Sequence, residues 1–178
     1  NHELASAGYV VVPLLDPDRV AAARAVLDAV GPAPGDPRAG LFNDTWSTDH
    51  RFKVGTSESL MRAFDGVVER TFTGHRNLAW TTITKWPGTE GAVVAHRDPS
   101  FVVEPRHASY GVWCALEDLD PAQGPLFVIP GSHRGAPPIR VHQSTDNLHP
   151  ELDPERDPRA RTILLPAGHA LVYHHALI

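Results

Sequence analysis

The chain has 178 residues, of which 42% are hydrophobic and 21% are charged, and its formal net charge is −5 at pH 7. This length and composition indicate about one globular domain, and they exclude a disordered chain, a membrane helix and, with a single cysteine, a disulfide framework. The acidic balance argues against nucleic acid as a partner, and the first residues lack the basic and apolar pattern of a signal peptide, so a cytoplasmic protein is expected.

The beginning of the chain predicts a strand followed by a helix. Residues 8–15 are rich in β-branched side chains, and Pro13 suits an edge strand because it lacks an N–H for a second neighbour. Asp16 has the side chain of an N-cap and is followed by a proline. Apolar residues then recur at intervals of three and four, which predicts a helix as far as residue 30.

The middle of the chain predicts a loop, a second helix and then a series of strands. A loop is expected over residues 32–56 because they are rich in glycine, proline and polar residues. Thr56 or Ser57 would cap the second helix, and alternation over residues 78–86 predicts a nine-residue strand. Further short strands are expected over residues 92–95, 110–116, 126–129, 162–165 and 170–178.

This order of elements predicts a mainly β fold. Helices followed by six or more short strands with turns between them are typical of a double-stranded β-helix, the cupin-like jelly roll, with N-terminal helices packed outside. The expected organisation is a single domain, with a helical part over residues 1–77 and the jelly-roll core over residues 78–178.

The motif that suggests chemistry is His96-x-Asp98, at the exit of a predicted strand. Residues two apart on a strand point to the same face, so one imidazole and one carboxylate can reach the same ion. With a distant histidine they would form the facial triad of non-haem Fe(II) oxygenases. A second such pair, His149 and Glu151, is set aside because Pro150 lies between them in a loop.

Residues 78–178 resemble the phytanoyl-CoA dioxygenase family of Fe(II)/2-oxoglutarate-dependent oxygenases, because several family motifs occur in the family's order and spacing. The motifs are Lys85-Trp86-Pro87-Gly88, His96-Arg97-Asp98, Trp113-Cys114-Ala115-Leu116, Gln123-Gly124-Pro125-Leu126 and Pro130-Gly131-Ser132-His133. The resemblance implies that Ser132 and His133 have a structural role in a tight turn.

The resemblance also implies a function. Fe(II) and 2-oxoglutarate would be the cofactors, and a small-molecule or carrier-bound substrate would be hydroxylated with release of succinate and CO2. His96 and Asp98 would bind the metal, and a carboxylate at position 98 favours hydroxylation over halogenation. In the family pattern the third ligand is expected directly after Ile178, followed later by the arginine that binds 2-oxoglutarate. His174 or His175 is the alternative third ligand.

The family pattern further assigns residues to the co-substrate pocket. Thr81 and Trp113 match positions that line it, and Lys85 would be a cation near the site, although core packing explains Trp113 equally well. Substrate contacts are expected from the loops 36–56, 99–109 and 134–160. Trp46, Phe101, His107 and Arg140 are candidates, although the absence of a role is favoured for each of them.

Three other functions remain open. The first is a non-catalytic or degenerate jelly-roll metal-binding protein, and the second is a cupin-type metalloenzyme of another class. The third is a carbohydrate-binding jelly roll without a metal, which the His96-x-Asp98 motif disfavours.

Overall fold

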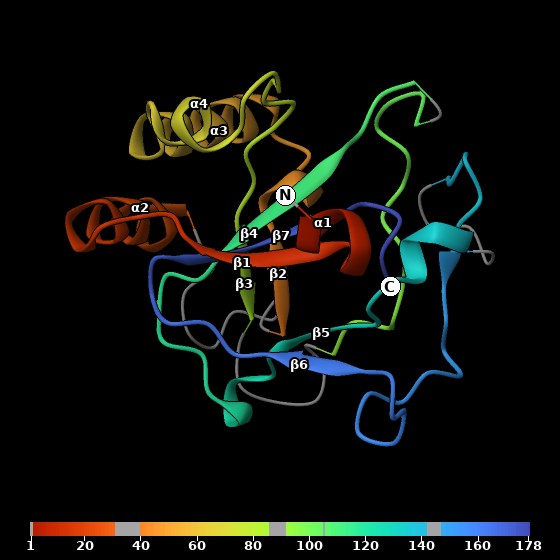
Figure 1. Ribbon diagram of the computed structural model, residues 1–178. Helices are drawn as coiled ribbons and strands as arrows, with labels where there is room; N and C mark the ends of the chain where they lie inside the picture. The colour runs from red at the N-terminus through yellow and green to blue at the C-terminus, as the bar shows by residue number, and fades with distance from the viewer. Residues whose placement is uncertain (1, 31–39, 86–91, 105, 142–146) are drawn as a thin grey trace. The chain divides into compact units, whose positions relative to one another are not determined.

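The computed structural model describes residues 2–30, 40–85, 92–104, 106–141 and 147–178 (Figure 1). The chain forms two compact units, one of residues 14–92 and one that combines residues 1–13 with residues 93–178. No helix within these described ranges is long and apolar enough to cross a membrane.

The unit of residues 14–92 contains helices α2 (Pro17–Val30), α3 (His50–Ala63) and α4 (Val67–Thr71), the 3-10 helix η1 (Asp44–Trp46), and strands β2 (Leu41–Asn43) and β3 (Ile83–Lys85). The start of α2 is as predicted, because a carboxylate oxygen of Asp16 accepts a hydrogen bond from the backbone N–H of Arg19 at 2.9 Å. The predicted end of this helix at Gly31-Pro32 lies outside the described residues.

The start predicted for the second helix is wrong. The side chain of Asp49 caps α3 by accepting hydrogen bonds from the N–H groups of Arg51 and Phe52, so the helix begins several residues before Thr56. Thr56 is buried within the helix and only 2% exposed. The capping carboxylate accepts hydrogen bonds from N–H groups that have no partner inside the helix. These bonds stabilise a helix start at His50, before the predicted cap.

The strand predicted over residues 78–86 is also shorter than expected. Within the described residues it consists of β3, which pairs antiparallel with β2 from Leu41↔Lys85 to Asn43↔Ile83. The ladder is shorter than the alternating stretch of sequence because β2 has only three residues with which β3 can pair. The prediction of a pure loop over residues 32–56 therefore missed β2.

The second unit contains helix α1 (His2–Ala7), the 3-10 helices η3 (Pro121–Gln123) and η4 (Ser132–Gly135), and strands β1 (Tyr9–Pro13), β4 (Tyr110–Cys114), β5 (Leu126–Val128), β6 (Arg161–Ile163) and β7 (His169–His174). β7 lies between β1 and β4 in an antiparallel sheet, and β5 pairs with β6 in another (Figure 1). β1 is an edge strand of its sheet, as Pro13 predicted.

The core of this unit lies between its two sheets. Leu171 of β7 is 2% exposed and packs in one cluster with Val128 of β5 and Ile163 of β6. Trp113 and Tyr173 are partly buried and pack against the same cluster. The described strands thus form antiparallel sheets accompanied by helices, which is the coarse part of the predicted fold class.

The Pro-Gly-Ser-His segment forms the structural turn that was expected. Gly131 has φ +79°, and its N–H donates to the carbonyl of Ala7 at 2.7 Å. A ring nitrogen of His133 contacts the carbonyl of Ala5 at 3.3 Å, and the hydroxyl of Ser132 accepts from the N–H of Ile178 at 2.9 Å. These contacts join the turn to α1 and to the segment after β7.

Candidate metal centre

His96 lies on an extended segment that pairs with a distant part of the chain. It forms an isolated antiparallel bridge with Leu148. The N–H of His149 donates to the carbonyl of Ala95 at 2.7 Å, and the N–H of Arg97 donates to the carbonyl of Asn147 at 2.9 Å. The strand predicted over residues 92–95 is not formed there; the extended pairing occurs at His96 instead. Its partner comes from a stretch that the sequence placed in a loop.

The side chain of His96 is oriented by the backbone two residues before it. Its Nδ1 is 2.8 Å from the carbonyl oxygen of Val94, so the proton of the neutral ring lies on Nδ1 and the lone pair on Nε2. Nε2 is 3.6 Å from Oδ1 of Asp98. The Asp98 carboxylate raises the pKa of His96 against the lowering effect of burial. This arrangement directs Nε2 of His96 and Oδ1 of Asp98 at each other.

The other oxygen of Asp98 is held by Tyr173. The phenol of Tyr173 donates a hydrogen bond to Oδ2 at 2.9 Å. Burial by itself would raise the pKa of Asp98, but its interactions with His96 and Tyr173 outweigh burial and lower it. Burial and the nearby carboxylate raise the pKa of Tyr173 well above its usual value, so the phenol keeps its proton. Asp98 is therefore an anion with one oxygen engaged and the other facing His96.

Tyr173 was not among the site residues predicted from the sequence. The sequence did contain a signal for it. Residues separated by an even number of positions share one face of a strand. His175 and Tyr173 are both separated in this way from the expected ligand position directly after Ile178. Tyr173 and His175 do lie close, with ring centroids 6.0 Å apart.

The residues present fit a divalent metal. Metal–nitrogen and metal–oxygen bonds are each about 2.0–2.2 Å long, so one ion can bind two atoms that are 3.6 Å apart. The Val94 carbonyl behind the ring of His96 and the Tyr173 phenol behind the carboxylate of Asp98 are the outer partners that orient metal ligands in proteins. In the described part of the chain no group of three His, Cys, Asp or Glu residues is arranged to hold a metal.

The two histidines considered as alternative ligands have partners of their own. Nδ1 of His174 accepts from the N–H of Ala176 at 3.1 Å, and its ring lies 5.5 Å from that of His133. Nδ1 of His175 contacts the hydroxyl of Ser109, and the residue is 9% exposed. Burial lowers the pKa of both rings, which keeps them neutral near pH 7.

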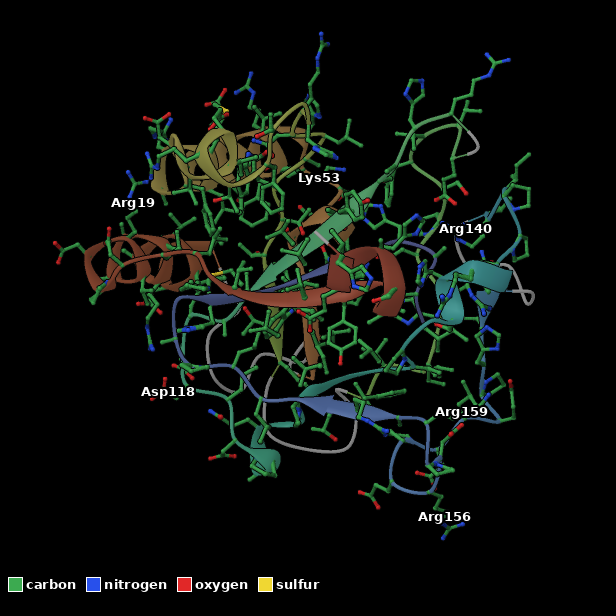
Figure 2. The ribbon with its side chains drawn as sticks, viewed as in Figure 1. Arg19, Lys53, Asp118, Arg140, Arg156 and Arg159 are labelled. Atoms are coloured by element: carbon green, nitrogen blue, oxygen red, sulfur yellow. The ribbon has the colours of Figure 1, made fainter. Side chains whose placement is uncertain are left out.

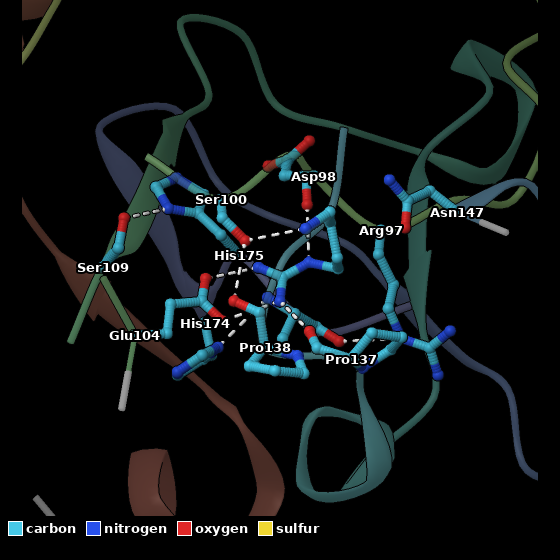
Figure 3. A network of polar contacts seen from close by, with 12 residues as sticks. Arg97, Asp98, Ser100, Glu104, Ser109, Pro137, Pro138, Asn147, His174 and His175 are labelled. Carbon is cyan, nitrogen blue, oxygen red and sulfur yellow. Dashed lines mark hydrogen bonds and ion pairs between the residues drawn. The ribbon is translucent and has the colours of Figure 1, made fainter. Parts of the chain in front are cut away.

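Arg97, the central residue of the motif, points to a different set of partners (Figure 3). Its Nε donates to the carbonyl of Ala176 at 3.0 Å, and one terminal nitrogen donates to Nε2 of His149 at 2.6 Å. Nδ1 of His149 faces Glu151 at 3.2 Å. Nε2 of His149 is thus engaged by Arg97, while Nδ1 faces the carboxylate of Glu151.

The residues assigned to the co-substrate pocket fall in both units. Thr81 and Lys85 belong to the unit of residues 14–92, and both are exposed there. Trp113 belongs to the other unit, pairs with Leu171 across β4 and β7, and packs against the core cluster. The Trp86-Pro87-Gly88 part of the Lys85 turn lies outside the described residues.

Arg140 does not have the free guanidinium expected of a substrate-binding residue. Its side chain is fully buried and paired with Glu104. The guanidinium is thus engaged by groups of the chain itself.

Comparison with known proteins places this site in a family. The sequence model of the phytanoyl-CoA dioxygenase (PhyH) family matches residues 4–178. A phytanoyl-CoA dioxygenase of Arabidopsis thaliana is 48% identical over 52 residues, which are 29% of this chain and 18% of that protein. The chain thus spans less than a fifth of that relative's length in the matched region.

Solved structures support the fold. HygX from Streptomyces hygroscopicus, determined with nickel, 2-oxoglutarate and hygromycin B bound, is similar with a TM-score of 0.63 and 16% identity, over 99% of this chain and 76% of HygX. SnoN, a non-haem α-ketoglutarate-dependent epimerase from nogalamycin biosynthesis, is similar with a TM-score of 0.56 and 20% identity, over 99% of this chain and 70% of SnoN.

An antiparallel β fold in which a histidine and a carboxylate face each other defines a candidate non-haem metal protein. The chain belongs to the phytanoyl-CoA dioxygenase (PhyH) family. That family depends on Fe(II) and 2-oxoglutarate, so the resemblance inferred from the motifs and the cofactors expected from it are confirmed.

Proposed function

We propose that this protein is a dioxygenase that hydroxylates a small-molecule or carrier-bound substrate and releases succinate and CO2. The observation that carries the proposal is the approach of Nε2 of His96 to Oδ1 of Asp98 at 3.6 Å, with the remaining atoms of both side chains held by other groups. In this proposal the described strands belong to a jelly roll within a single domain.

The proposed metal ligands are His96, Asp98 and a histidine directly after Ile178, as in the family pattern, with His174 or His175 as the alternative third ligand. Bound iron would supply O2 activation coupled to oxidative decarboxylation of 2-oxoglutarate. Val94 and Tyr173 would keep His96 and Asp98 in their orientations, because each holds the side-chain atom that does not face the proposed metal position. Thr81, Lys85 and Trp113 are proposed to line the co-substrate pocket.

The choice of hydroxylation rests on Asp98. A carboxylate that binds the metal occupies the position where a halide would otherwise enter, so a halogenase needs a small residue there. HygX was solved with hygromycin B bound, and this supports a small-molecule substrate in the present proposal.

Anaerobic titration of the full-length protein with Fe(II) and 2-oxoglutarate tests the proposal through the metal-to-ligand charge-transfer band. We expect the band in the wild type and its loss in His96→Ala and Asp98→Ala. His50→Ala is the matched control, because His50 is exposed at the start of α3 in the other unit. The absence of the band in the wild type, or its retention in Asp98→Ala, would contradict the proposal.

The same titration separates the candidates for the third ligand. If a histidine after Ile178 is the ligand, His174→Ala and His175→Ala keep the band. Loss of the band in one of them, with its thermal unfolding unchanged, would assign that histidine to the metal instead.

A further inference from the structure

The guanidinium of Arg140 is buried against Glu104 within the unit that contains the candidate metal centre. The side chain of Arg140 is 0% exposed and that of Glu104 is 9% exposed. NH1 of Arg140 donates to Oε2 of Glu104 at 2.7 Å, and NH2 donates to Oε1. Two parallel charge-assisted hydrogen bonds of this kind fix the plane of the guanidinium as well as its position.

The remaining donors of Arg140 are directed at the backbone of the metal motif and its neighbourhood. Nε donates to the carbonyl oxygen of Asp98 at 2.8 Å, and NH1 also donates to the carbonyl of Pro137 at 2.9 Å. Ser100 joins the segment of Asp98 to that of Arg140 a second time. Its hydroxyl accepts from the N–H of Arg140 at 3.0 Å, and its N–H donates to the carbonyl of Arg140 at 2.9 Å.

Asp98 is consequently held at two points. Tyr173 binds the side chain through Oδ2, and Arg140 binds the main chain through the carbonyl oxygen. A single hydrogen bond would leave the carboxylate free to turn about it, whereas one contact on the side chain and one on the backbone together limit where Oδ1 can point. Oδ1 is the atom that faces His96.

We propose that the Arg140–Glu104 pair is a positioning device that fixes the backbone of Asp98 and thereby aims its carboxylate at the metal. Arg140 reaches the backbone carbonyl of Asp98 and not its carboxylate, and Glu104 acts by holding the guanidinium in the plane from which Nε reaches Asp98. The inference rests on the proposed function, since Asp98 is taken as a metal ligand. Removal of such outer partners lowers metal affinity by about 10–100-fold in other metal sites.

The test removes both charges at once. A variant with one partner would keep an uncompensated buried charge and unfold for that reason, whereas Glu104→Gln with Arg140→Met leaves no buried charge. Binding of Ni(II) and Co(II) to the full-length protein is measured calorimetrically without 2-oxoglutarate, together with the thermal unfolding midpoint. We expect the double variant to remain folded and to bind both metals about 10–100-fold more weakly.

Two controls separate positioning from general weakening of the fold. Asp157→Asn with Arg159→Met removes a pair remote from the metal motif, in which the side chain of Arg159 is 64% exposed and that of Asp157 is 11% exposed (Figure 2). Ile163→Val loosens the core, where Ile163 is 6% exposed. Both should bind metal with wild-type affinity, and Ile163→Val should do so despite a lower unfolding midpoint.

Arg140→Lys keeps the charge beside Glu104 and covers the case in which the double variant does not fold. A lysine ammonium cannot reproduce the fork and the Nε contact together, so this variant should also bind Ni(II) about tenfold more weakly or worse. Wild-type affinity in a folded double variant, or in Arg140→Lys, would overturn the positioning role. A wild-type protein that binds neither metal would instead overturn the proposed function.

Discussion

Replacing Gly111 by alanine should displace Tyr173 from Asp98. Gly111 and Tyr173 are direct partners across β4 and β7. A Cβ on Gly111 would lie 2.3 Å from Cζ and 2.6 Å from the hydroxyl oxygen of Tyr173, where ordinary contact begins at 3.4 Å. The ring must therefore withdraw by about 1 Å. A withdrawal of that size stretches the 2.9 Å hydrogen bond to Asp98 towards about 4 Å, beyond hydrogen-bonding distance.

The expected loss of stability has two parts. Overpacking of a well-packed site lowers the free energy of unfolding by about 1–3 kcal/mol. A hydrogen bond to a charged group contributes about 1.5–3 kcal/mol. We expect Gly111→Ala to lose about 3–5 kcal/mol, less than the sum of the extremes because neighbouring effects are not additive.

A double-mutant cycle with Tyr173→Phe measures the two parts by urea unfolding. Phenylalanine keeps the ring and lacks the hydroxyl, so Tyr173→Phe alone should lose about 1.5–3 kcal/mol. In that background Gly111→Ala should cost only the overpacking, about 1–3 kcal/mol. The reasoning is refuted if Gly111→Ala is as stable as the wild type, or if it costs the same in both backgrounds.

Three further predictions concern single side chains elsewhere. Burial raises the pKa of Cys114 to about 12, so at pH 8 iodoacetamide should alkylate it about 10³-fold more slowly than a free thiol of pKa about 8.5; reaction of the native chain at the rate seen in urea would contradict this. Asp44→Ala removes the acceptor that lies 2.7 Å from the N–H of Thr82 and should lower the free energy of unfolding by about 1–3 kcal/mol, whereas Asp44→Asn, which keeps an acceptor, should lose less. Leu171→Ala should lose about 2–5 kcal/mol in urea unfolding and Leu171→Met less than about 1.5 kcal/mol, and equal losses would argue against a close-packed site.

The elements that the sequence predicted well are those with a signal inside a few neighbouring residues. The start of α2 follows from the Asp16 cap, and β4 and β7 follow from β-branched and aromatic runs bounded by turns. Boundaries that depend on a partner were wrong. The length of β3 is set by β2, and the start of α3 by a cap, Asp49, that precedes the apolar stripe.

The sequence by itself determined the family and singled out His96 and Asp98, because two residues separated by one other place their side chains on the same face of an extended segment. Only the tertiary structure decided what holds them. Tyr173 lies 75 residues from Asp98, and Arg140 lies 42 residues from Asp98 and 36 from Glu104. No local periodicity records contacts over such separations. They exist because the folded chain brings β7 and the segments around Glu104 and Arg140 to Asp98. In this buried environment a charge or polar group without a partner would destabilise the fold.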